Sequence, residues 1–303
     1  MNLETEFCGI RLKNPTVLAS GILGVSKALL SDVIKNGAGA VTIKSVSFES
    51  REGHKNPTVI AFDAGMMNAV GYSNPGVAGA KKEFAGLEKL GAPVFASVIG
   101  QEPEDFVKVL EGLKGLGFSA IEIPLSCPHT PGFGTLAGQD TPEKTSEITK
   151  AVVKHAELPV FVKLSHITRN IGEVARAAEK AGASAITAIN TGGPGMIINI
   201  EAKKPVMGFK IGGISGPALK PIAVRCVYDI YENVKIPIIG TGGILSGRDA
   251  IEMMMAGAKA IGIGSGIYYR GMDVFRNVCD EIAGWMKKNG YESLDEIVGA
   301  AHG

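Results

Sequence analysis

A cysteine and a histidine follow one apolar strand and precede a segment rich in glycine. The run Ala120–Ile123 is largely apolar, as in a buried strand, and Pro124 ends it because proline has no N–H to donate to a neighbouring strand. Cys127 and His129 come next, and the glycine-rich segment that follows carries almost no charge. A thiol in this position can act as a general base. The alternative is a structural cysteine, since most free cysteines are buried and inert.

Other polar residues that could contact a ligand follow or end predicted strands elsewhere in the chain. Lys44 and Lys163 each end an apolar strand, and Asn190 and Thr191 end another. Lysine is rarely buried without a partner, so these ammonium groups predict an electron-rich ring or an anionic substrate nearby. The alternative is an exposed lysine at a strand end. Asn68 lies in a long loop, and amides there suit a ligand that presents both donors and acceptors.

Glycine pairs follow the last two strands of the chain. Gly242 and Gly243 follow one of them, and Gly264 to Gly266 follow the other with Ser265 between two glycines. One such pair is usually only a turn, but both together indicate a phosphate site built from backbone N–H groups. A ligand with a phosphate, such as flavin mononucleotide (FMN), would fit.

The elements that must position these residues form a repeating pattern. A helical segment ends in glycine, which fits the left-handed conformation that closes a helix, and an apolar strand follows within a few residues. Helices are predicted over Pro103–Leu116, Ile171–Ala181, Pro217–Glu232 and Arg248–Ala256. The predicted strands start near Val17, Ala40, Val94, Ala120, Val160, Ala185, Ile236 and Ala260.

This count of strands predicts a TIM (β/α)8 barrel. The alternative, a doubly wound open sheet, is weakened because no GxGxxG follows the first strand. The longest connections follow the second, fourth and sixth strands, so the extra residues are expected at the C-terminal face, where barrel active sites lie. The segment around Phe7–Leu12 predicts an N-terminal hairpin on the barrel floor. We expect one domain over residues 1–303.

Composition narrows the class of protein. The 303 residues include 45% hydrophobic and 20% charged residues with a formal net charge of +1, which gives no electrostatic indication of nucleic-acid binding. The four cysteines are far apart and no CxxC occurs, so no metal site is expected. Neither a signal peptide nor an apolar run long enough for a membrane span is found. The sequence predicts a cytoplasmic protein with reduced thiols.

Several segments together resemble a known family. These segments are LKNPTVLASG (12–21), TIKSVS (42–47), MMNAVGYSNPG (66–76), LSCPH (125–129), AGQDTPE (137–143), VKLS (162–165), INT (189–191), GGISGPALKPIA (212–223) and IIGTGGI (238–244). They extend over nearly the whole chain and resemble the class 1 dihydroorotate dehydrogenases, most closely the class 1B catalytic subunits. That resemblance implies a TIM-barrel flavoprotein that oxidises dihydroorotate to orotate on FMN in pyrimidine biosynthesis.

The resemblance also implies roles for individual residues. Cys127 would be the base that removes a proton from C5 of the substrate while the C6 hydride passes to flavin N5. The residues that match cofactor contacts are Ala19, Ser20, Gly21, Lys44, Ser45, Ser97, Lys163, Ile189, Gly216, Gly242, Gly243, Gly264 and Ser265. The residues that match substrate contacts are Lys44, Asn68, Ala69, Val70, Gly71, Tyr72, His129, Asn190 and Thr191.

Partners and alternatives follow from the same resemblance. Class 1B enzymes have a homodimeric core of this subunit and a second subunit with FAD and an iron–sulfur cluster, which passes electrons to NAD. Ser97, Pro124 and His129 stand where the family usually has asparagine. His129 also occurs in the related dihydropyrimidine dehydrogenases, so a dehydrogenase or reductase of a related ring is one alternative function. An FMN-binding subunit without turnover is another, and it fits less well with the retained Cys127, Lys44 and Lys163.

Overall fold

The computed structural model describes residues 2–126, 132–133 and 138–303. Parallel strands form a closed barrel of eight, which confirms the TIM barrel and excludes the open sheet. Around the barrel the strands are β3 (Thr16–Leu18), β4 (Ala40–Thr42), β7 (Val94–Ser97), β8 (Ala120–Pro124), β9 (Val160–Leu164), β10 (Ala185–Ala188), β15 (Ile238–Thr241) and β16 (Ala260–Ile263). β15 starts two residues after the predicted Ile236, whose N–H is bound instead by the side chain of Glu179.

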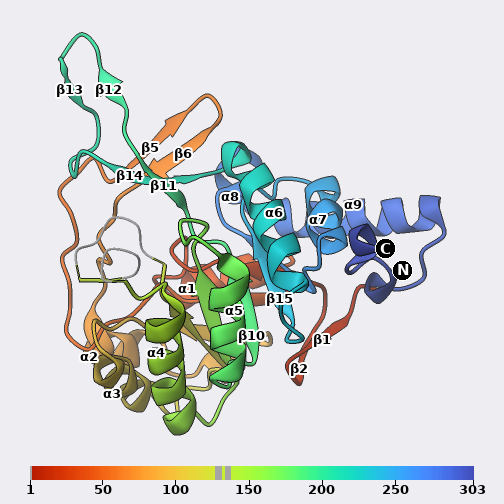
Figure 1. Ribbon diagram of the computed structural model, residues 1–303, viewed down its shortest axis with the longest axis horizontal. Coiled ribbons are helices and arrows are strands. Elements are labelled where there is room, and N and C mark those ends of the chain that lie inside the picture. Colours follow the sequence, from red (N-terminus) through yellow and green to blue (C-terminus); the bar gives the residue numbers. More distant parts are fainter. Residues whose placement is uncertain (1, 127–131, 134–137) are drawn as a thin grey trace.

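Helices surround the barrel on its outer side (Figure 1). The α-helices are α1 (Lys27–Lys35), α2 (Gly76–Glu83), α3 (Pro103–Leu113), α4 (Pro142–His155), α5 (Ile171–Lys180), α6 (Lys220–Tyr231), α7 (Gly247–Met255), α8 (Gly266–Arg270) and α9 (Val274–Asn289). Short 3-10 turns are η1 (Leu87–Leu90), η3 (Pro217–Leu219), η4 (Leu294–Glu296) and η5 (Ala300–His302). The helix expected over Pro103–Leu116 ends at Leu113, because Gly115 and Gly117 have φ of 78° and 85°, in the left-handed region.

Side chains inside the barrel form layers because alternate residues of a strand point to the same face. The lowest layer is apolar and includes Val17, Ala40, Phe95, Ala120, Phe161, Ala185, Ile239 and Ala260. Two residues further along the strands the buried side chains are polar, namely Thr42, Ser97, Glu122, Lys163, Thr187 and Thr241. We call these six residues the polar layer.

The predicted N-terminal hairpin is present and closes the floor of the barrel. β1 (Thr5–Phe7) pairs antiparallel with β2 (Ile10–Leu12), and the turn between them has φ of 53° at Cys8 and 76° at Gly9. Phe7 packs edge-on against Phe161 with ring centroids 5.4 Å apart. The floor is therefore filled by side chains, and ligand access must be from the opposite end.

The long connections after the second and sixth barrel strands meet in a second sheet. This antiparallel sheet has the order β11 (Gly192–Gly195), β14 (Gly212–Ser215), β6 (Gly65–Asn68) and β5 (Val59–Phe62). A small hairpin of β12 (Ile198–Asn199) and β13 (Lys204–Pro205) extends from it (Figure 1). The long loops were predicted, but their pairing with each other was not. No helix within the described ranges is long and apolar enough to cross a membrane.

Candidate active site

A cavity of about 260 Å³ lies at the C-terminal ends of the barrel strands, beneath the second sheet. Most of the residues predicted to bind cofactor or substrate line it. These are Ala19, Ser20, Gly21, Lys44, Ser45, Asn68, Val70, Gly71, Tyr72, Lys163, Ile189, Asn190, Thr191, Gly242, Gly243, Gly264 and Ser265. Segments far apart in the sequence thus converge on one concave surface, as expected of a TIM-barrel active site.

Three predicted residues lie behind this surface. Ser97 is fully buried, and its Oγ lies 2.8 Å from Oγ of Ser45, which itself lines the cavity. Ala69 is also fully buried, and its N–H donates to the carbonyl of Thr58. Gly216 follows the cavity residue Ser215 without lining the cavity itself. Two further predicted residues, Cys127 and His129, lie outside the described part of the chain.

The remaining cysteines lie elsewhere in the molecule. Cys8, Cys226 and Cys279 are free thiols, and none of them lines the cavity. Burial raises the pKa of Cys8 to about 12, and it raises the pKa of Cys226 and of Cys279 to about 11. These thiols stay protonated and unreactive near neutral pH. None of these three thiols is therefore a candidate for the predicted base.

The walls of the cavity are tied together by hydrogen bonds between distant segments. Asn190 Nδ2 donates to the backbone carbonyl of Ser126, 3.2 Å away, which joins the end of β10 to the segment after β8. Asn68 Nδ2 lies 3.5 Å from the carbonyl of Gly213 on the neighbouring strand β14. Tyr72 packs edge-on against Phe133 with ring centroids 5.5 Å apart. These amides are held in position before any ligand arrives.

A cluster of polar side chains extends from the cavity lining into the barrel. Ser20 Oγ donates to Oε1 of Glu122 over 2.7 Å and accepts a hydrogen bond from Lys163 Nζ over 3.0 Å. Thr187 Oγ1 donates to the other carboxylate oxygen of Glu122 over 3.1 Å. Lys163 was predicted at the barrel mouth and does line the cavity, but its side chain is only 4% exposed.

Glu122 and Thr187 were not among the predicted site residues, although the sequence contains a signal for both. Each occupies the alternate position of a strand whose other residues are apolar, AIEIP in β8 and AITA in β10. A charge inside a buried strand needs a partner, so it marks a polar interior. Glu122 and Thr187 do not line the cavity themselves, whereas Pro124 does, as expected from its place at the end of β8. The cavity residues that were not predicted are Ile22, Val59, Met66, Ser215, Leu219, Thr241, Ile244 and Gly262.

The loops after β15 and β16 border the cavity, and glycines in them have different surroundings. Gly243 has φ of 71°, and a Cβ there would lie 2.5 Å from Cβ of Lys220, so only glycine fits. Around Gly264 the nearest atom to an added Cβ would be Cβ of Ala19 at 3.7 Å. Consecutive backbone N–H groups in such tight turns form concavities that bind anions.

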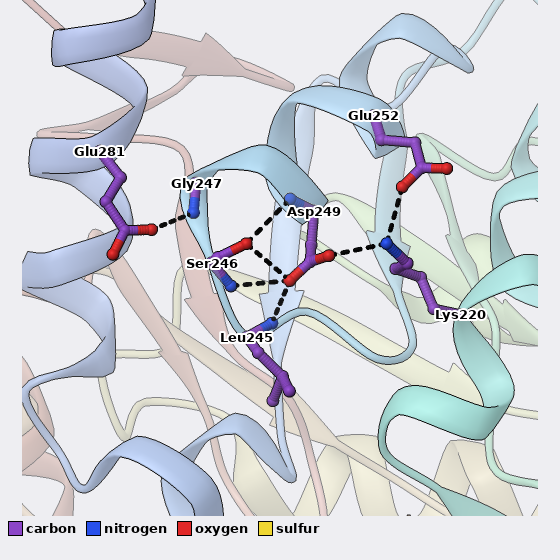
Figure 2. A network of polar contacts seen from close by, with 7 residues as sticks. All are labelled: Lys220, Leu245, Ser246, Gly247, Asp249, Glu252 and Glu281. Carbon is purple, nitrogen blue, oxygen red and sulfur yellow. Dashed lines mark hydrogen bonds and ion pairs between the residues drawn. The ribbon is translucent and has the colours of Figure 1, made fainter. Parts of the chain in front are cut away.

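An ion-pair network stands behind the first of these loops (Figure 2). Lys220 Nζ lies 2.7 Å from Asp249 and 2.8 Å from Glu252, which joins the start of α6 to α7. Burial alone would raise the pKa of Asp249, but hydrogen bonds from Lys220, Ser246 and the N–H of Leu245 outweigh it and lower that pKa. The network fixes the chain just after the Gly242–Gly243 turn.

Comparisons with known proteins agree with this geometry. The profile of the family described as dihydroorotate dehydrogenase matches residues 2–286. A Methanocaldococcus jannaschii protein named dihydroorotate dehydrogenase B (NAD(+)), catalytic subunit, is 45% identical over 99% of this chain and 98% of its own. A Methanothermobacter thermautotrophicus protein of the same name is 42% identical, again over 99% of this chain and 98% of its own.

The fold agrees as well. The crystal structure of DHODH in complex with ferulenol from Eimeria tenella superimposes with a TM-score of 0.84, at 22% identity, over 99% of this chain and 88% of that one. With a family profile that matches most of the chain and relatives this similar over their full length, the chain belongs to the dihydroorotate dehydrogenase family.

Proposed function

We propose that this protein oxidises dihydroorotate to orotate, with FMN as the hydride acceptor, as the catalytic subunit of a class 1B enzyme. The observation that carries the proposal is the cavity that joins Lys44, Asn68, Lys163 and Asn190 from four separate segments of the chain. The relatives named dihydroorotate dehydrogenase B (NAD(+)), catalytic subunit, support the same substrate and reaction type. As a member of this family the protein is an oxidoreductase.

The residues present fit a flavin nucleotide. Thr241 lines the cavity, and its Oγ1 is buried with no hydrogen-bond partner among the described residues. Buried hydroxyls normally have a partner, so a bound ligand would supply one. Gly21 and Gly264 leave room where a side chain would otherwise enter the cavity. Backbone N–H groups near Gly243 and Ser265 would hold the phosphate, and Lys44 and Lys163 would face the electron-rich ring.

The chain's own residues would bind the substrate and move one proton. Lys44 would counter the negative charge of the substrate, and Asn68 and Asn190 would offer amide donors and acceptors to its polar edges. Cys127 would take the proton from C5, which requires the thiolate form of its side chain. Bound FMN would supply the hydride acceptor, so that C6 of the substrate is oxidised as C5 loses its proton. The buried walls of the cavity would exclude water from this exchange.

The cofactor can be tested first. Protein purified under mild conditions should be yellow, and acid should release one FMN per chain, identified by its mobility and fluorescence. Gly243→Val should abolish FMN retention because the added side chain collides with Lys220. Gly271→Val is a suitable control at another glycine of positive φ, since a Cβ there would meet no atom within 4 Å. Protein that carries no flavin and binds none when FMN is added would refute the proposal.

The electron acceptor gives a second test. We infer that a separate subunit with FAD and an iron–sulfur cluster passes the electrons to NAD. The purified chain should therefore reduce an artificial dye with dihydroorotate but form NADH only slowly. Rapid NADH formation by the chain alone would show that no separate electron-transfer subunit is needed. Sedimentation of the same sample would show whether the chain forms the homodimer expected of this class.

A related ring remains the second candidate substrate, and one observation favours it. Pro124 lines the cavity at the position where the family usually has an asparagine, so one side-chain hydrogen bond to orotate is missing. Anaerobic addition of dihydroorotate and of dihydrouracil to separate samples, followed by the loss of flavin absorbance, would distinguish the two. Bleaching by dihydrouracil alone would favour the dihydropyrimidine reaction.

A further inference from the structure

The polar layer of the barrel contains one carboxylate and one ammonium. Within the ranges that the structure describes, Glu122 and Lys163 are the only charged side chains in the buried class, at 3% and 4% exposure. They come from neighbouring strands β8 and β9, and both point into the barrel. Charges this deep need compensation, because water cannot solvate them.

Hydrogen bonds and an ion pair determine how the two charged groups are oriented. Both oxygens of Glu122 accept hydrogen bonds, one from Ser20 and the other from Thr187. Lys163 Nζ lies 3.8 Å from Glu122 Oε1 and donates to Ser20 Oγ, the acceptor found for it among the described residues. An ammonium has three N–H groups, so Lys163 keeps donors for the cavity that it lines. Glu122 does not line the cavity.

This arrangement determines how much positive charge the cavity experiences. The carboxylate lies behind the ammonium, with Ser20 between them, and the pair together carries no net charge. Electrostatic effects are strong in such a buried setting, because little solvent screens them. Without the carboxylate, a ligand in the cavity would face an uncompensated cation.

We propose that Glu122 is a positioning residue that holds Lys163 towards the cavity and offsets its charge, and thereby lowers the reduction potential of the bound flavin. The proposal rests on the proposed binding of FMN. The reduced cofactor carries more negative charge than the oxidised one, so any gain in local positive charge favours reduction. A purely structural Glu122 would support folding without affecting this equilibrium.

The test replaces each charge with a neutral amide and measures the midpoint potential of the bound FMN by equilibration with redox dyes. Glu122→Gln removes the negative charge and keeps one acceptor oxygen for Ser20 or Thr187. Its NH2 group takes the place of the second oxygen, where the remaining hydroxyl can accept a hydrogen bond instead. We expect it to favour the reduced form about tenfold, which is a rise of about 30 mV for a two-electron couple. Lys163→Gln should shift the potential in the opposite direction, because the carboxylate is then unbalanced.

The double variant Glu122→Gln with Lys163→Gln is the decisive measurement. It replaces one neutral pair by another, so its potential should return close to that of the original protein. If Glu122 serves only the fold, the double variant should instead match Lys163→Gln alone, and the proposal is wrong. Should Glu122→Gln fail to fold alone, the double variant and Lys163→Gln still decide the question.

Two controls separate this result from other causes. Thr187→Val removes a hydrogen bond to the same carboxylate without a change of charge, and its potential should stay near the original. Glu122→Asp keeps the charge, so it should also stay near the original value. The FMN content of every variant is measured first. Protein without flavin would count against the proposed function, whereas flavin-loaded variants with an unchanged potential would overturn only the role of Glu122.

Discussion

Asn190 Nδ2 lies 3.2 Å from the backbone carbonyl of Ser126, the residue that immediately precedes Cys127 in the chain. The other end of the Asn190 amide accepts a hydrogen bond from the N–H of Thr191 over 2.9 Å. One side chain therefore lines the cavity and at the same time holds Ser126, the residue before the proposed base.

Asn190→Ala should weaken orotate binding and slow turnover together. Loss of a buried hydrogen-bond partner costs about 1–3 kcal/mol, so kcat/KM should fall roughly 5- to 150-fold. Steady-state kinetics with an artificial acceptor measure this change, and a spectral titration with orotate measures affinity. Asn199→Ala, at an exposed asparagine of β12, is the matched control and should behave as the original protein. Equal kinetics in both variants would show that Asn190 contributes neither to substrate binding nor to turnover.

Cys127→Ala should nearly abolish turnover while FMN stays bound. General bases typically contribute about 10²–10⁴-fold to the rate. Cys127→Ser should keep some activity, with its pH profile displaced upwards because a hydroxyl is a much weaker acid than a thiol of pKa about 8.5. Cys226→Ala is the matched control, since Cys226 is a buried thiol outside the cavity. More than about a tenth of the original rate in Cys127→Ala would exclude this cysteine as the base.

Pro124→Asn should tighten orotate binding. Pro124 lies beside Lys163 in the register of β8 and β9 and lines the cavity, but it offers neither an N–H nor a polar side chain. An amide there should add about one hydrogen bond, roughly 0.5–1.5 kcal/mol, or two- to tenfold in affinity. Flavin spectral titration compares the two proteins, with Pro205→Asn in β13 as control. Unchanged affinity in a folded Pro124→Asn variant would mean that orotate is held elsewhere or is not the ligand.

Asp249→Asn should destabilise the protein in a manner that depends on pH. The pKa of Asp249 is lowered in the folded protein, so its ionised form stabilises the fold above the ordinary carboxyl pKa. That contribution disappears as pH falls through the lowered value. We expect Asp249→Asn to lower the free energy of unfolding by about 1–2 kcal/mol at pH 7, and this difference should decrease steadily below about pH 4.

Chemical unfolding of both proteins across this pH range gives the measurement. An asparagine at this position keeps one side-chain oxygen that can accept from the N–H of Ser246, the N-cap residue of α7, so the difference reports the charge of Asp249. Asp32→Asn is the control, because its ion pair with Lys35 spans 3.9 Å on an exposed helix surface and should contribute little. A loss that does not vary with pH would show that the ion pair with Lys220 is not its source.

The sequence by itself determined the barrel and most of the cavity wall. Glycine after many of the predicted helices and apolar runs such as Val160–Val162 are local signals, and the eight predicted strands leave few topologies. Strand ends in a barrel face one direction, so Lys44 and Asn190 could be assigned to a common site from their positions alone. The hairpin at Phe7–Leu12 was also predicted from its own residues.

Only the tertiary structure decided how these residues pair across the barrel. The hydrogen bond between Ser20 and Glu122 joins residues 102 positions apart, and nothing local in either segment encodes that contact. The sheet formed by β6 and β14 likewise depends on two distant loops meeting above the barrel. Ser97 turned out to lie behind Ser45 because the alternation of side chains in β7 places it inside the barrel, below the cavity. Such contacts follow from barrel closure and strand register, which bring distant side chains into one layer.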